Sequence, residues 1–476
     1  MREKIIRDIK TPYGLIFLLL AGIRLFFNAV IPLTDKTEAR YGEIARLMSE
    51  TGNWIVPQID YGVPFWAKPP LSAWLSAGAV NLFGDSEFAL RLPYWIVAVL
   101  IALLLSYYGH QKKINVFIPG IILFTLPEFF LHAGVLSTDM MLSFSIAITL
   151  LSFWEFIHVD RPRVFGLLFF IGIGLGLLAK GPIVGILSIP PLFIWCMWHK
   201  KYVKKLVQIP WIVGITICLL IALPWYLLME INSPGFIDYF VVGEHFLRFI
   251  DSSWSGDKYG FPKQQPLGII WVFLLAGALP WSFVLLASIK KGFKKISCDP
   301  WQRFLWLWIL WTPFFFTFSK SLIHTYTLPV MIPIALLITH HWPNYKRKKT
   351  ILYIAVGLPV LMLGSYFFKP IQQLIFNSTD KELVLHPNVD ASQLYALHSK
   401  SYSSQFYSRG KIKVISTYAL ENLQRLPAPA FVIIKKGDLQ KISPEVLGKL
   451  IPLQEQRKAG VYTFKQNTPT QFNLTF

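Results

Sequence analysis

Apolar runs of membrane-spanning length recur along this chain. The first, from Tyr13 to Leu33, is long enough to cross a hydrocarbon core, which takes about 20 residues of helix. Only 15% of the 476 residues are charged and 54% are hydrophobic, a composition that excludes a soluble protein of this size. Ten further runs follow at approximately 88–108, 115–131, 137–157, 163–180, 182–198, 207–229, 266–289, 301–318, 325–341 and 350–367. The sequence therefore predicts an α-helical multi-pass membrane protein with about eleven spans.

Basic residues predict how these spans are oriented. Every second loop is basic, as at Lys112-Lys113 and Lys200-Lys201. Basic loops stay in the cytoplasm, so two long loops, 34–87 and 230–265, are expected outside a cytoplasmic (inner) membrane, on its periplasmic face. The net charge of +20 has the same cause, and membrane lipids rather than nucleic acid are the expected surroundings.

The first long loop, residues 34–87, is expected to contain two helices. An apolar stripe at helical spacing, which includes Tyr41 and Ile44, predicts an amphipathic helix over Glu38–Glu50. Such a helix would lie along the membrane surface. Lys68-Pro69-Pro70 then opens a second helix that runs to Gly84, since proline is tolerated in a first turn.

The second long loop and the tail differ from the apolar runs in composition. Residues 230–265 are partly rich in Gly and Ser and are expected to be irregular. From about Phe368 the chain becomes polar. We therefore predict a membrane domain over residues 1–367 and a small α/β domain outside the membrane over 368–476. Its expected strands are Phe431–Ile434 and Val461–Phe464, and its expected helices are Tyr418–Arg425 and Ser443–Leu450.

Ionisable side chains from five separate segments gather on the expected outer face. Outside loops are polar in any case, but ionisable groups at an apolar boundary are costly and tend to be functional. A carboxylate can take a proton from an acceptor hydroxyl, and cations can stabilise a departing phosphate. These features permit glycosyl transfer from a lipid phosphate, and they also fit a transporter. The side chains are Asp35, Glu38, Arg40, Lys68, Asp139, Glu244, His245, Arg248, Lys320, His324 and Tyr326.

A series of motifs runs through the membrane part in a fixed order. It includes Asp35-Lys-Thr-Glu38-Ala-Arg40-Tyr41, Trp66-Ala-Lys68-Pro69-Pro70, Ser137-Thr138-Asp139-Met140, Lys180-Gly181-Pro182, Glu244-His245-Phe-Leu-Arg248 and Tyr326-Thr-Leu328-Pro329. The series resembles the aminoarabinose transferase and protein mannosyltransferase group, which are polyprenyl-phosphate-sugar-dependent glycosyltransferases of the membrane GT-C class. The resemblance implies a GT-C-like fold and an inverting hexosyl- or pentosyltransferase.

The resemblance implies catalytic roles for three carboxylates. Asp35 matches the essential acidic residue of the first loop, the candidate base or acceptor-positioning group. Glu38 is its rival, because two residues separate the pair here, whereas some relatives have an adjacent acidic pair. Asp139 matches the acidic residue of the second loop.

The resemblance also implies which side chains face the donor phosphate. These are Lys68, Arg248 and Tyr326, with His245 nearby and Lys320 as a further charge. Some aminoarabinose transferases carry a metal-ligating Glu before Lys-Pro-Pro, and Ala67 stands there in this chain. The sequence therefore assigns no metal ligand and no cofactor, and a divalent metal stays an open alternative.

The implied partners are an undecaprenyl-type sugar donor and a lipid, glycan or protein acceptor. Transfer of aminoarabinose to lipid A is the nearest match, and transfer of mannose or another sugar to protein or surface glycan is the alternative within the class. The alternative of another class is a lipid-linked-sugar transporter or flippase. A transporter should show internal repeats and polar residues near the membrane midplane, and the sequence shows neither pattern.

Two charged positions are expected to be structural. Lys180, before Gly181-Pro182, fits a turn whose lysine extends to the membrane surface. Glu87 and Arg91 are one helical turn apart and are expected to pair.

Overall fold

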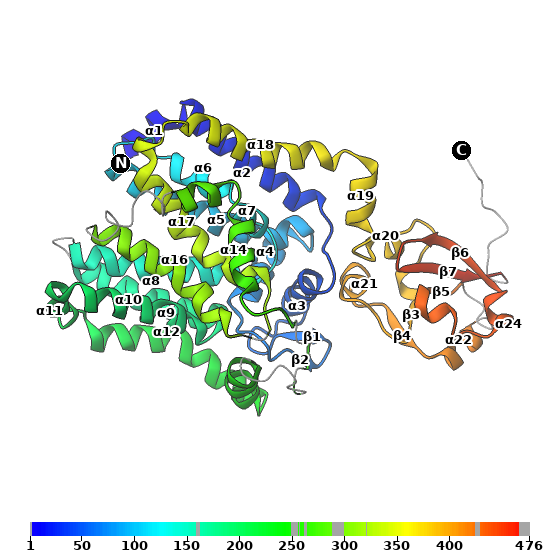
Figure 1. Ribbon diagram of the computed structural model, residues 1–476. Helices are drawn as coiled ribbons and strands as arrows, with labels where there is room; N and C mark the ends of the chain where they lie inside the picture. Colours follow the sequence, from blue (N-terminus) through cyan, green and yellow to red (C-terminus); the bar gives the residue numbers. More distant parts are fainter. Residues whose placement is uncertain are drawn as a thin grey trace.

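The structure is a computed structural model that describes residues 2–158, 162–248, 256, 258–260, 264–287, 299–319, 321–423 and 429–465. A bundle of helices makes up most of the molecule, and a smaller part with a sheet lies to one side (Figure 1). The long helix α18 (Lys348–Tyr366) runs along α2 (Pro12–Val30) and leads from the bundle to that smaller part (Figure 1).

Helices occur at all the apolar runs that the sequence indicates. Short helices lie before and between these runs. In chain order, the helices of the bundle outside the two long loops include α1 (Arg2–Ile9), α2, α5 (Glu87–Gln111), α6 (Ile118–Phe124), α7 (Pro127–His132), α8 (Thr138–His158), α9 (Pro162–Lys180), α10 (Ile183–Trp198), η1 (Lys200–Tyr202), α11 (Val203–Leu206), α12 (Trp211–Asn232), α14 (Ile269–Gly277), α16 (Pro300–Thr317), η3 (His324–Thr327), α17 (Leu328–His341), η4 (Trp342–Asn344) and α18. Helices α8 and α17 lie at the centre, where they pack on each other and on their neighbours.

Length and apolarity mark six of the described helices as able to cross a membrane. A seventh is possible where α14 and the helix Trp281–Ala287 form one span, although they are bent by 112° at a break that contains Pro280. Several other apolar helices are shorter than a full span, such as α10. The chain is thus a multi-pass membrane protein, and the count of eleven spans stays a prediction.

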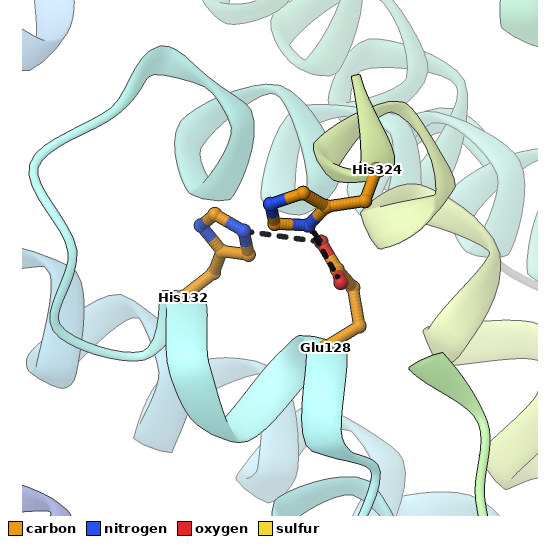
Figure 2. Close-up of side chains that lie close together, drawn as sticks. All are labelled: Glu128, His132 and His324. Atoms are coloured by element: carbon orange, nitrogen blue, oxygen red, sulfur yellow. Dashed lines mark hydrogen bonds and ion pairs between the residues drawn. The ribbon is translucent and has the colours of Figure 1, made fainter. Parts of the chain in front are cut away.

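The run predicted over 115–131 is divided into two short helices. Proline disfavours helical geometry in the residue before it, and Leu126 is extended. The Thr125 hydroxyl donates to the carbonyl of Ile121 at 2.8 Å, which helps to close the end of α6. The break turns α7 so that Glu128 and His132 point toward His324 (Figure 2).

The first long loop contains the two predicted helices, α3 (Thr37–Thr51) and α4 (Leu71–Phe83), with a small hairpin of β1 (Gln58–Asp60) and β2 (Val63–Pro64) between them. Gly52, with φ of +67°, ends α3 in the left-handed conformation that glycine adopts without strain. The face of α3 opposite its apolar stripe is not left to solvent. Glu43 and Arg46 are buried because α21 (Tyr402–Tyr407) packs on this helix.

The second long loop is more regular than the sequence suggests. After α12 ends, a π-helical segment, η2, runs from Asp238 to Leu247. The Glu230 carboxylate accepts hydrogen bonds from the backbone N–H groups of Gly235 and Ile237 at 2.8 and 2.7 Å, which fixes the turn before η2. Phe236 and Phe240 stack with ring centroids 5.3 Å apart. This aromatic pair packs at the start of the segment, and composition alone does not reveal the helix.

The C-terminal part, residues 368–476, contains a five-stranded sheet in the order β4-β3-β5-β7-β6. β3 pairs in parallel with β4 and β5, whereas β7 pairs antiparallel with β5 and β6. Its elements are α19 (Lys369–Phe376), α20 (Lys381–Val384), η5 (Ala391–Gln393), β3 (Leu394–Leu397), α21, β4 (Lys413–Ile415), α22 (Thr417–Leu423), β5 (Phe431–Lys435), α23 (Lys436–Leu439), α24 (Pro444–Leu447), β6 (Leu450–Glu455) and β7 (Ala459–Phe464).

Both strands predicted in the C-terminal part are confirmed, as β5 and β7. Apolar clusters cover the two faces of the sheet, which explains the continuous apolar run of β5. The helix predicted over Tyr418–Arg425 is present as α22, Thr417–Leu423, and its last two predicted residues lie outside the described residues. The helix predicted over Ser443–Leu450 ends at Leu447. Leu450 instead pairs with Phe464 at the start of β6.

Candidate active site

Asp35 lies where the helical bundle meets the C-terminal part. It follows α2, and α21 covers it from the opposite side. The backbone N–H of Ser403 donates to Asp35 Oδ1 at 3.0 Å, and the Ser403 hydroxyl donates to Oδ2. Ser378 holds the Asp35 backbone through a 3.1 Å hydrogen bond. A residue 368 positions away thus fixes the orientation of this carboxylate.

Burial raises the pKa of Asp35 from 3.8 to about 6. The hydrogen bonds from Ser403 oppose this rise, since they favour the ionised carboxylate, and the nearby carboxylate of Asp380 adds to it. A carboxylate with a pKa near 6 is ionised at neutral pH and binds a proton more readily than an exposed aspartate. That property suits a general base.

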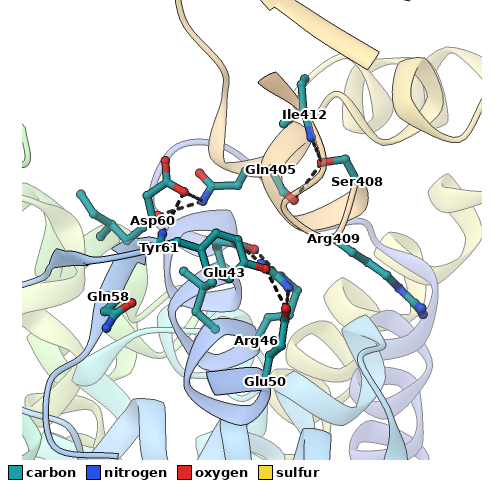
Figure 3. A network of polar contacts seen from close by, with 12 residues as sticks. Glu43, Arg46, Glu50, Gln58, Asp60, Tyr61, Gln405, Ser408, Arg409 and Ile412 are labelled. Atoms are coloured by element: carbon teal, nitrogen blue, oxygen red, sulfur yellow. Dashed lines mark hydrogen bonds and ion pairs between the residues drawn. The ribbon is translucent and has the colours of Figure 1, made fainter. Parts of the chain in front are cut away.

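Polar contacts also connect α21 of the C-terminal part with the first long loop (Figure 3). The Gln405 amide donates to the carbonyl of Ile59 at 3.1 Å and to Asp60 Oδ1 at 3.0 Å. Beneath it, Arg46 forms a buried ion pair with Glu43 at 2.7 Å. The Gln405 hydrogen bonds join α21 to β1, and α21 also packs on α3, where this ion pair lies.

Glu38 is held in a different way. Arg91 Nε and Nη2 donate to its two carboxylate oxygens at 2.8 and 2.9 Å, and both side chains are buried. Burial alone would raise the pKa of Glu38, but the charge of Arg91 lowers it below its ordinary value. The expected Glu87–Arg91 pair is wrong, because Glu87 contacts Lys381 and accepts from the Tyr407 hydroxyl at 2.9 Å. Glu38 is therefore a fixed anion.

Asp139 forms an ion pair with Lys180 at 2.5 Å. The Lys180 ammonium lies 4.6 Å from the ring centroid of Tyr326, a distance typical of a cation–π contact. Its backbone carbonyl lies 3.2 Å from His245 Nε2. Lys180 is therefore not a surface-directed lysine of a turn, as the sequence suggests. It connects Asp139, Tyr326 and His245, which come from three distant segments.

Lys68 and Arg248 share one carboxylate. Lys68 Nζ lies 3.0 Å from Glu244 Oε2, and Arg248 Nη1 lies 3.1 Å from Glu244 Oε1. Burial lowers the pKa of Lys68. Burial would raise the pKa of Glu244, but the charges of Lys68 and Arg248 outweigh it and lower the pKa. Two cations around one anion leave a positive charge that suits a phosphate group.

A small pocket lies between α3 and the start of α4, beside these cations. Its wall includes Lys68 and Thr138, the residue before Asp139. The residues that line it are Tyr41, Ile44, Pro57, Phe65, Lys68, Pro69, Ser72, Ala73 and Thr138.

The structure brings some of the predicted site residues together and leaves others apart. Lys68 and Arg248 meet through Glu244, whereas Asp139, Tyr326 and His245 meet through Lys180. Asp35 and Glu38 lie in two separate groups, with Ser403 and Arg91 as their respective partners. Lys320 lies outside the described residues.

One set of side chains could hold a metal ion within the described residues, and the sequence did not indicate it. It consists of Glu128, His132 and His324. Among the described residues His245 does not belong to such a set, and its two ring nitrogens lie within hydrogen-bond distance of the backbone carbonyls of Phe240 and Lys180. The sequence signal that could have revealed the set is the helical spacing of Glu128 and His132 in an otherwise apolar segment.

Comparison with known proteins supports the resemblance that the sequence motifs indicate. Residues 26–240 match the family described as dolichyl-phosphate-mannose-protein mannosyltransferase. The chain is 29% identical over 316 residues to the undecaprenyl phosphate-alpha-4-amino-4-deoxy-L-arabinose arabinosyl transferase of Aeromonas salmonicida, covering 64% of this chain and 55% of that protein. It is 27% identical over 338 residues to the same-named protein of Erwinia tasmaniensis, covering 70% and 59%. The chain thus spans less than two thirds of these relatives.

The fold also matches solved structures. ArnT from Cupriavidus metallidurans, bound to undecaprenyl phosphate, superposes with a TM-score of 0.76 at 15% identity, covering 97% of this chain and all of that one. The oligosaccharyltransferase AglB from Archaeoglobus fulgidus gives 0.51 at 12% identity, covering 97% and 75%. At these identities the likeness establishes the fold, and it confirms the predicted GT-C-like class. In sequence this chain is thus similar to aminoarabinose transferases and, over residues 26–240, to the protein mannosyltransferase family, and its fold is that of the membrane GT-C class.

Proposed function

We propose that this protein is an inverting glycosyltransferase that moves a sugar from a polyprenyl-phosphate carrier to an acceptor at the outer face of the cytoplasmic membrane. The observation that carries the proposal is the pair of cations, Lys68 and Arg248, around the single carboxylate of Glu244. Their surplus positive charge matches a phosphodiester. The names of the relatives further support an undecaprenyl-phosphate-linked aminoarabinose as the donor.

The reaction is a single displacement at the anomeric carbon. Asp35, ionised at neutral pH, takes the proton of the acceptor hydroxyl as its oxygen attacks. The bond between the anomeric carbon and the phosphate oxygen breaks, and its electron pair stays with the phosphate. Lys68 and Arg248 stabilise the negative charge that develops there. Attack from the face opposite the leaving group inverts the configuration of the sugar.

The remaining residues of the site orient these groups. Asp139 forms an ion pair with Lys180, and the Lys180 ammonium lies against the ring of Tyr326. Lys180 and Tyr326 therefore form a second polar wall of the donor site. His245 fixes the carbonyl end of α9 through Lys180. Glu38 keeps Arg91 neutralised beneath the loop that carries Asp35. We assign Lys320 to the donor side on the resemblance alone.

The acceptor that fits best is lipid A, with protein or surface glycan as the alternative. The match of residues 26–240 to the protein mannosyltransferase family is the observation that favours the alternative. A flippase is less consistent with the contacts, because the ionisable groups form fixed ion pairs near the loops 34–87 and 230–265. We also propose that residues 1–367 form the membrane domain and that 368–476 form a domain on the outer face, where it covers Asp35.

Mass spectrometry of lipid A and surface glycans tests the function. Cells with the gene are compared with deletion cells and with cells that carry Asp35→Asn. We expect lipid A with an added aminopentose only in cells that have the unaltered gene. An added hexose on protein or glycan would favour the alternative acceptor. Unchanged glycans, together with altered distribution of the lipid-linked sugar across the membrane, would contradict the transferase and support a flippase.

A further inference from the structure

Three metal-ligating side chains converge near the start of η3. Glu128 and His132 lie one turn apart on α7, and His324 is the first residue of η3 (Figure 2). His132 Nε2 lies 3.0 Å from Glu128 Oε1, and His324 Nδ1 lies 3.0 Å from both oxygens of Glu128. The ligand atoms of all three side chains lie within 4.8 Å of one another.

His132 has polar atoms that nothing in the described chain satisfies. Its side chain is only 3% exposed. Neither ring nitrogen makes an aligned hydrogen bond with a described residue, although Nε2 lies at ion-pair distance from Glu128. A buried ring nitrogen that makes no hydrogen bond loses the one that water would give it, which is unfavourable for folding. The ring nevertheless points toward the Glu128 carboxylate (Figure 2). An ion between the two would satisfy it.

We propose that Glu128, His132 and His324 bind one Zn²⁺ ion. Two imidazoles and one carboxylate form a ligand set that zinc uses in proteins. Bonds of 2.0–2.2 Å in a tetrahedron place neighbouring ligand atoms about 3.3 Å apart, which the present 3.0 Å contacts reach with small shifts. The proposal does not depend on the proposed function.

The surroundings leave a fourth coordination position open. Glu128 and His132 are buried, but the side chain of His324 is 49% exposed. Solvent can therefore reach the ion from the side of η3, where a water molecule completes the tetrahedron. Gly277 of α14 packs against Glu128 from another side, where any side chain would collide with it. The buried ligands are thus fixed, and the exposed one closes the site.

The ion would fix the position of η3 on α7. These two elements come from segments 196 residues apart in the chain. Tyr326 lies in the same short helix as His324, and its ring contacts Lys180. Binding of zinc would therefore hold Tyr326 in place beside the Asp139–Lys180 pair. The ion would thus position Tyr326, and it would take no part in the bonds that are made and broken in the transfer reaction.

The test measures metal in the purified full-length protein. The protein in detergent is stripped with a chelator, loaded with Zn²⁺, freed of excess metal, and assayed by inductively coupled plasma mass spectrometry. We expect about one zinc per chain and a melting temperature a few degrees above that of the stripped protein, since an ion that binds only the folded state stabilises it. Cobalt in place of zinc should give the visible absorption of a tetrahedral site.

Variants separate this site from others. His324→Ala and Glu128→Gln should lower the zinc content at least tenfold, and His132→Ala should do the same. His324 is half-exposed, so its variant is expected to fold even if the buried variants do not. His386→Ala removes a histidine of the C-terminal part and should keep the zinc. Wild-type protein without zinc, or zinc that survives His324→Ala but is lost in His245→Ala, would overturn the proposal.

Discussion

The pH dependence of transfer tests the role of Asp35 and its dependence on the C-terminal part. If Asp35 acts as the base, kcat/KM should fall on the acidic side with an apparent pKa of about 6. Ser403→Ala removes the hydroxyl that donates to Asp35 Oδ2, whereas the backbone N–H of residue 403 remains. The lost hydrogen bond favoured the ionised carboxylate, so the pKa of Asp35 should rise and the acidic limb should move to higher pH.

The size of the shift follows from the strength of the lost bond. A hydrogen bond to a charged group contributes about 1.5–3 kcal/mol, and one pKa unit corresponds to about 1.36 kcal/mol, so the limb should move up by about 1–2 units. At pH 7 the ionised fraction of Asp35 would fall from about nine tenths to between a half and a tenth. Transfer by Ser403→Ala at pH 7 should therefore be about 2–10 times slower, and it should recover at higher pH.

The assay follows transfer to lipid A vesicles between pH 5 and 9 at low donor concentration. Ser408→Ala is the matched control, because Ser408 lies one residue after the end of α21 and donates to the Gln405 carbonyl without touching Asp35. The apparent pKa of the acidic limb in Ser408→Ala should equal that of the wild-type protein. An unmoved limb in Ser403→Ala, or equal losses in both variants at all pH values, would refute the assignment of Asp35 as the titrating base.

Three further predictions concern charge and topology. Lys68→Ala should lower kcat/KM about 10²–10³-fold, as for loss of one donor to a developing anion, with the protein still folded by size-exclusion chromatography. Glu38→Gln leaves Arg91 buried without its anion, so thermal unfolding should show a loss of about 3–5 kcal/mol, whereas Glu445→Gln, at an exposed pair, should change little. Cysteine at Gln58 in a cysteine-free chain should react with an impermeant thiol reagent in intact spheroplasts, and labelling only after permeabilisation would reverse the proposed topology.

The helices could be predicted from the sequence because a bilayer demands a fixed length of apolar chain. The strands β5 and β7 could be predicted because a sheet covered on both faces requires an unbroken apolar run. The short helix over Asp238–Leu247 could not be predicted, since it lies in a segment of mixed composition and packs through tertiary contacts such as the stacking of Phe236 on Phe240. The break before Pro127 was visible as a proline, but an apolar run with a proline can also continue as a kinked helix.

The motifs supplied the candidate site residues, which stay predictions, but they did not indicate the partners of these side chains. Lys68 and Arg248 were identified as cations for a phosphate, but nothing in either motif indicated that Glu244 lies between them. Local spacing suggested that Arg91 pairs with Glu87, yet a carboxylate 53 residues away is its partner. Spacing along one helix gives contacts on its surface, whereas a buried arginine pairs with the anion that the tertiary fold brings to it.

The arrangement of fixed charges constrains what the site can bind tightly. Lys68, Arg248 and Lys180 carry three positive charges, and Glu244 and Asp139 carry two negative ones. The surplus of one positive charge balances a sugar phosphodiester, which has one negative charge. In the proposed reaction, the carrier phosphate left after transfer is a monoester and gains further negative charge, because its second pKa is near 6. Glu244 and Asp139 then repel it, so the same ion pairs that orient the cations favour release of the spent carrier.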